Sequence, residues 1–141
     1  SIGLNSIKDH VLKKNISYSL ILTDFYCWIL NRTDVALILR EMIIKAGITL
    51  YASIMESILH VEPFERIRPA QSFNRRLQGF KIAGLIDDNL SVKLLWLWER
   101  RAAIHLYILD AKEYVKYSDS DYDKAAYLTM DILRRLEELN K

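Results

Sequence analysis

The chain has 141 residues, of which 51% are hydrophobic and 27% are charged, and it contains only four glycines and two prolines. A chain of this length and composition is expected to form a single domain over residues 1–141, and its shortage of turn-forming residues favours helices. The formal net charge of +2 is too small to indicate, by itself, a nucleic-acid or membrane partner.

Cysteine usage and hydropathy bear on the compartment of the protein. Cys27 is the only cysteine and lies in an apolar run, so no disulfide framework is expected and a reducing, cytoplasmic setting is favoured. The sequence has no uncharged apolar run of 18 residues and no basic segment leading into an apolar one, so no membrane partner and no secretory signal are predicted. No spacing of His, Cys or carboxylates is typical of zinc, so neither a metal nor another cofactor is predicted.

The first half of the chain has the apolar spacing of helices. Residues 6–31 are predicted to form one or two helices, with apolar residues at Ile7, Val11, Leu20, Ile21, Phe25, Trp28 and Ile29. A long helix is predicted from residue 34 to about residue 60, and either Thr33 or Asp34 can cap its free N–H groups. Both prolines fall within residues 61–69, which are therefore expected to form a loop.

The second half of the chain is also predicted to be helical. A shorter helix fits residues 70–83 and ends at Gly84, in the manner of a glycine C-cap. A further helix extends from residue 89 to about residue 117, and a polar turn at 118–121 caps a last helix over residues 122–139. The fold class expected from these elements is an all-α, antiparallel bundle of four to five helices.

The helix predicted over residues 89–117 carries charge in an apolar run. Arg100, Arg101 and His105 stand among tryptophans, leucines and alanines, where a charged group must be paired or solvated. At about 100° per residue, Arg101 and His105 share a face, whereas Arg100 and His105 are about 140° apart. Two such helices side by side across a twofold axis could bring both arginines and both histidines into one cleft, which predicts a homodimer with a composite site.

The segment Arg100-Arg-Ala-Ala-Ile-His105 resembles the R-x4-6-H signature of HEPN domains. The run from Phe80 to Leu90, with its Gly-Leu-Ile-Asp turn, resembles the short helix and acidic turn that precede the signature helix in that family. The polar turn and the final helix after Tyr117 also fit, so the resemblance covers roughly residues 34–140.

The resemblance implies a HEPN-like bundle that dimerises through its signature helices. Many HEPN domains are metal-independent endoribonucleases, among them toxins of toxin–antitoxin pairs and effectors of antiviral defence. By this resemblance Arg100 and His105 are the catalytic residues, RNA is the substrate, and an antitoxin protein is a possible partner. Other HEPN domains are catalytically silent, and active ones often carry Asn, Asp or His at the position of Arg101. A non-catalytic module that binds RNA, a nucleotide or a protein therefore remains the alternative, and a purely structural helical dimer is a third.

The residue types suit metal-free RNA cleavage, which needs a base for the 2′-OH proton and a cation for the charge on the phosphorane. His105 can serve as the base, because imidazole titrates near neutral pH. Arg100 can hold a phosphate oxygen with two N–H donors, and Arg101 can do the same.

Further charged residues are candidates for supporting roles. Glu56, in an apolar stretch, and Glu99 can orient the arginines or the histidine, although a helix-surface position is an equal alternative for Glu56. Five basic residues without an intervening acid form a candidate RNA-binding surface, for which a solvated helix face is the alternative: Arg66, Arg68, Arg75, Arg76 and Lys81.

Overall fold

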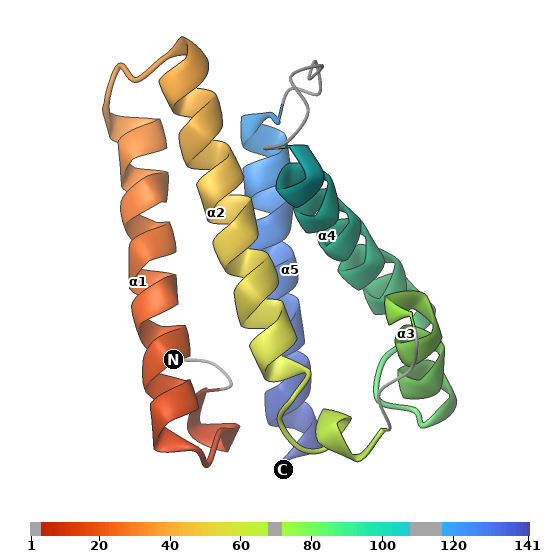
Figure 1. Ribbon diagram of the computed structural model, residues 1–141. Helices are drawn as coiled ribbons and strands as arrows, with labels where there is room; N and C mark the ends of the chain where they lie inside the picture. Colours follow the sequence, from red (N-terminus) through yellow and green to blue (C-terminus); the bar gives the residue numbers. More distant parts are fainter. Residues whose placement is uncertain (1–3, 68–71, 108–116) are drawn as a thin grey trace.

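The computed structural model describes residues 4–67, 72–107 and 117–141, and in these ranges its regular structure is entirely helical (Figure 1). Two short 3₁₀ turns, Leu4–Ser6 and Phe64–Arg66, accompany the α-helices. The α-helices are α1 (His10–Arg32), α2 (Leu37–Ile58), α3 (Phe73–Ile82), α4 (Asp88–Tyr107) and α5 (Asp119–Leu139). The predicted all-α bundle of four to five helices is confirmed.

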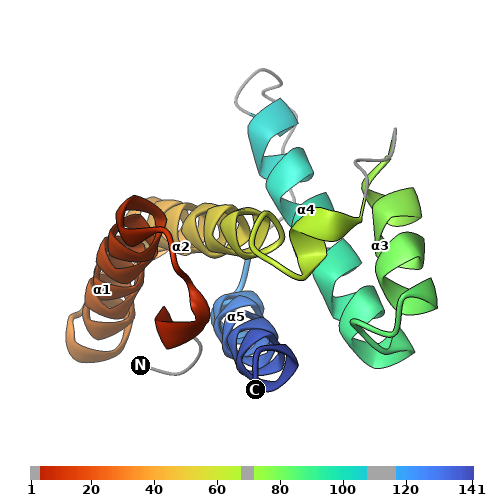
Figure 2. The same ribbon diagram turned by 90° about the horizontal axis from the view of Figure 1, so that it is seen from below.

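Helices α2 and α5 form the centre of the bundle. Helix α1 packs along α2 on one side, and α4 packs against both central helices on the other side, with α3 outermost (Figure 2). Figure 1 shows that α1 and α4 run opposite to α2 and α5. Of the described helices, none is long and apolar enough to cross a membrane.

Tyr122 of α5 joins the three helices on the α1 side of the bundle. Its ring lies over Gly47 of α2, where an added Cβ would be 2.2 Å from Tyr122 Cε2. The same ring meets Tyr51 edge to face, with centroids 5.5 Å apart, and its hydroxyl donates a hydrogen bond to the carbonyl of Thr23 in α1. All three side chains, those of Thr23, Tyr51 and Tyr122, are buried. The glycine therefore permits the close contact on which this junction depends.

Two of the predicted helix ends are confirmed. Gly84 follows α3 with a φ of 74°, and the N–H of Leu85 bonds back to the carbonyl of Phe80, as in a glycine-terminated helix. Ser118 and Asp121 form a reciprocal capping box at the start of α5. Both ends depend on local chemistry that is visible in the sequence.

The predicted cap of α2 is wrong. Helix α2 begins at Leu37, its N-cap is Ala36, and no side chain bonds to its first N–H groups. Thr33 instead ends α1, because its hydroxyl donates a 2.6 Å hydrogen bond to the carbonyl of Ile29. The segment of residues 34–36 therefore connects the two helices and does not open the second one.

Candidate functional site

Helix α4 is anchored at its start and open at its outer face. The Asp87 carboxylate accepts a 2.7 Å hydrogen bond from the N–H of Leu90, and Leu94 and Leu97 are fully buried against the core. Glu99, Ala102 and Ala103 are exposed on the opposite side. The two arginines of the candidate site thus belong to a helix that has one face buried in the core and the opposite face exposed.

Arg101 lies against α2. Its guanidinium forms an ion pair with Glu56, and its Cζ is 5.8 Å from the centroid of the Trp98 ring. The two charged side chains are each 31% exposed. Together with Trp98 and Ala102 they line a hollow of about 310 Å³ between α2 and α4. The acid that the sequence singled out in an apolar stretch of α2 therefore neutralises the second arginine of the candidate site.

Helix α3 packs against the Trp98 side of this hollow. The ring of Phe73 stacks on Trp98, with centroids 4.5 Å apart and an interplanar angle of 13°. Arg76 donates a 2.7 Å hydrogen bond to the carbonyl of Leu59, the residue that caps α2. Burial lowers the pKa of Arg76, and the charge of Glu56 acts in the opposite direction. The guanidinium of Arg76 is thus turned inward to join α3 to the end of α2.

Arg100 lies on the other flank of α4. Its Cζ is 5.7 Å from the ring centroid of Trp96 and 6.0 Å from that of Tyr117. Lys124 of α5 places its Nζ 4.2 Å from the same Trp96 ring. Two cations therefore flank one indole ring at the junction of α4 and α5. Neither Lys124 nor Tyr117 was a predicted site residue, because their proximity to Arg100 depends on how α5 packs against α4.

The side chain of His105 lies outside the described part of the structure. Its backbone belongs to the last turn of α4, one helical turn beyond Arg101. Among the residues whose side chains are described, Arg100 and Arg101 have no ring or ion-pair neighbour in common, which agrees with the divergence expected for adjacent residues on a helix.

The predicted RNA-binding residues have different surroundings. Arg66 pairs with Glu62 at 3.3 Å, and Lys81 pairs with Asp88 at 3.2 Å. Arg75 is exposed on α3, and Arg68 lies outside the described residues. Glu62 precedes the basic stretch in the sequence and Asp88 follows it. These two acids neutralise Arg66 and Lys81, although the stretch itself contains no acid.

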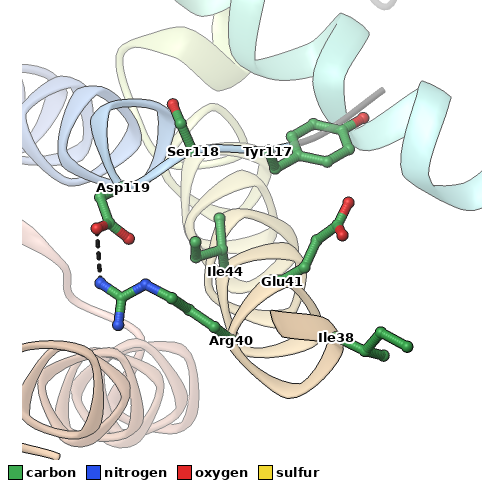
Figure 3. A pocket seen from close by; sticks show the side chains of 7 residues that line it. All are labelled: Ile38, Arg40, Glu41, Ile44, Tyr117, Ser118 and Asp119. Atoms are coloured by element: carbon green, nitrogen blue, oxygen red, sulfur yellow. Dashed lines mark hydrogen bonds and ion pairs between the residues drawn. The ribbon is translucent and has the colours of Figure 1, made fainter. Parts of the chain in front are cut away.

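A larger hollow, of about 520 Å³, lies between the start of α2 and the start of α5 (Figure 3). Its cation, Arg40, bonds to Asp119 at 2.6 Å and also donates to the carbonyls of Leu30 (3.0 Å) and Val35 (3.3 Å). Arg40 thus links α5 to the connection between α1 and α2. A guanidinium engaged in this way is a structural link, so the α4 region remains the better candidate site.

No known protein family matches this chain, and neither a curated protein nor a solved structure resembles it significantly. Within the described ranges, no three His, Cys, Asp or Glu side chains come together as a possible metal site.

Proposed function

We propose that the protein is a metal-independent endoribonuclease of the HEPN type, acting as a toxin or defence effector, with a composite active site at a homodimer interface. The observation that carries the proposal is the position of Arg100. It lies at the junction of α4 and α5, half-buried against Trp96 and Tyr117, with Lys124 on the same indole ring. Cations beside aromatic rings suit RNA, because phosphates attract the charges and bases stack on the rings.

In the proposed reaction His105 takes the proton of a ribose 2′-OH, and the 2′-oxygen attacks the adjacent phosphorus. The P–O5′ bond breaks, the leaving 5′-oxygen takes a proton from water, and the products are a 2′,3′-cyclic phosphate and a 5′-OH end. Arg100 donates N–H groups to the phosphate oxygens, where charge accumulates in the transition state. Pairing of two α4 helices across a twofold axis would supply both residues from both copies.

The test is cleavage of RNA in the presence of EDTA by the wild type, Arg100→Ala and His105→Ala. Each substitution is expected to lower the rate by about 10²-fold or more, since loss of a general base or of an oxyanion donor has effects of this size. Arg134→Ala is the matched control, because Arg134 is an exposed cation on α5 that pairs with Asp131 and lines a hollow at the start of α4, and it is not among the described contacts of Arg100. Equal rates in all four proteins would remove Arg100 and His105 from the mechanism.

The ion pair between Arg101 and Glu56 favours a second candidate, a non-catalytic HEPN-like module that binds RNA, a nucleotide or a protein. An arginine neutralised by its own fold has less net charge to offer to a transition state. RNA binding that weakens with salt, without cleavage at any enzyme concentration, would support this candidate over the nuclease. For a toxin, the partner would be an antitoxin protein that covers the α4 face.

A further inference from the structure

Helix α1 carries a second apolar face that nothing in the described structure covers. Its buried positions Ile16, Thr23 and Leu30 recur every seven residues and face the bundle. Six large apolar side chains, 39–70% exposed, lie on the opposite side: Val11, Tyr18, Ile21, Leu22, Phe25 and Trp28. We call these six residues the α1 stripe. Figure 2 places α1 at the edge of the bundle, so the stripe faces away from α2 and α5.

The α1 stripe has the spacing of a coiled-coil seam. Five of its members follow one another at intervals of seven, three, four and three residues, as positions a and d of a heptad do, and Lys14 occupies the one remaining d position. A helix that needs only one apolar face for its own fold does not require this second repeat. Its partner should therefore be another helix with a matching seam.

We propose that the α1 helices of two copies of this chain pair antiparallel across a twofold axis. In this register Val11 faces Trp28 of the partner subunit, and Tyr18 faces Ile21 of the partner subunit. The residue numbers of each facing pair add up to 39, so one twofold axis relates all the facing pairs. The seam is thus self-complementary, as an interface between identical subunits must be.

Charge selects the antiparallel direction. Parallel pairing would place Lys14 against Lys14 of the partner subunit in the seam, where like charges repel. Antiparallel pairing places Lys14 against Phe25 of the partner subunit, a cation–ring contact. Lys14 already lies along the stripe, with its Nζ 6.0 Å from the centroid of the Tyr18 ring. Lys13, near the N-terminal end of α1, then meets the C-terminal part of the partner helix, where the helix dipole is negative.

The area of the stripe is sufficient for such a dimer. Aromatic side chains have about 150–250 Å² of surface each and aliphatic ones somewhat less, so the three aromatic and three aliphatic side chains of the stripe, which are about half exposed, offer on the order of 500 Å² or more per copy. Two copies would bury about 1,000 Å² or more, the area that a biological interface is expected to reach. The same patch is near the upper limit of what a monomer ordinarily leaves open to water.

Pairing through α1 is independent of the proposed catalytic interface. Helices α1 and α4 lie on opposite sides of the central helices (Figure 2), so one contact does not obstruct the other. Loss of the α1 contact should therefore lower the mass of the assembly, to that of a monomer where α1 alone pairs and to that of the α4 dimer where both pair, whether or not RNA is cleaved.

The first test is the mass in solution, by light scattering at about 50 μM, a concentration at which interfaces of this size commonly associate. Ile21→Glu/Phe25→Glu is expected to have at most half the mass of the wild type. The control is Tyr127→Glu, which places a glutamate on an exposed aromatic position of α5 and should keep the wild-type mass. Circular dichroism confirms that each variant is helical. Equal masses for the wild type and the α1 variant would overturn the proposal.

The second test is the direction of pairing, in a Cys27→Ser background. Val11→Cys and Trp28→Cys proteins are mixed under mild oxidation, and a disulfide between the two variants is expected. A Val11→Cys protein that cross-links to itself would overturn the antiparallel register. A monomeric wild type that binds anionic phospholipid vesicles through the stripe would overturn the proposal in favour of a membrane surface.

Discussion

At the scale of single residues, the pairing of Glu56 with Arg101 controls how much positive charge the α4 hollow offers to a polyanion such as the RNA that we propose as substrate. Glu56→Gln removes the acid and releases the guanidinium, so RNA affinity should rise several-fold. The plot of log affinity against log salt concentration should become steeper by about one, because one more phosphate is neutralised. Fluorescence anisotropy with a labelled RNA at several salt concentrations measures both effects.

Glu138→Gln is the matched control, since it removes an acid from an ion pair on α5 that involves Arg135. Its effect on the salt dependence should be small. An unchanged affinity for Glu56→Gln would mean that RNA does not contact Arg101. Stability should change by no more than about 1 kcal/mol, because water screens an ion pair that is one-third exposed.

The sequence identified both members of this ion pair and offered the arginines or the histidine as partners of Glu56, but it did not specify which of them Glu56 contacts. Glu56 was notable as an acid in an apolar stretch, and Arg101 as a charge in an apolar helix. Their contact spans 45 residues of chain and depends on the rotation of α4 against α2, which local patterns do not specify. The same limit explains why Lys124 and Tyr117, which lie beside Trp96 and Arg100, were not predicted.

At the scale of helices, the contact between α2 and α5 depends on Gly47. Gly47→Ala should destabilise the fold by about 1–3 kcal/mol, because the new methyl group would overlap the buried ring of Tyr122. This penalty outweighs the gain of about 1 kcal/mol in helix propensity. Urea unfolding followed by circular dichroism gives the free energy of unfolding.

Gly79→Ala provides the comparison within the same chain. Its added Cβ would lie 3.0 Å from Cγ2 of Ile67, a side chain that can shift, so the loss should be clearly smaller than at Gly47. A Gly47→Ala protein as stable as the wild type would mean that α2 and α5 can separate without loss of packing.

Helix ends were predictable where the capping chemistry is local. Gly84 ends α3 through its own positive φ. Ser118 begins α5 through hydrogen bonds with Asp121, three residues further along the chain. Thr33 carries an equally good capping side chain, but it bonds backward to α1, and the sequence alone does not give the direction of that bond. The apolar residues of α1 predicted a helix correctly. They could not indicate which of its two apolar faces enters the core, since both have helical spacing.

At the scale of the whole molecule, the junction of α1, α2 and α5 contains two buried phenols whose ionisation opposes folding. Burial raises the pKa of Tyr122, and the neighbouring Tyr51 raises it further; burial also raises the pKa of Tyr51. In the unfolded chain both phenols titrate near the ordinary value of about 10. Above that pH the unfolded chain releases protons that the folded protein retains, so the free energy of unfolding falls as the pH rises.

Below about pH 9 the free energy of unfolding should therefore not depend on these two phenols. Above about pH 10 it should fall by up to about 1.4 kcal/mol per pH unit for each phenol. Urea unfolding between pH 8 and pH 11 measures the slope. The double variant Tyr51→Phe/Tyr122→Phe should show a smaller fall in the free energy of unfolding with pH. This holds although the variant is less stable at every pH, because it lacks the hydrogen bond to Thr23. Tyr127→Phe, which changes an exposed phenol on α5, should keep the wild-type slope. An equally steep fall in the double variant would place the alkaline sensitivity elsewhere, and the junction would then stabilise the bundle through packing alone.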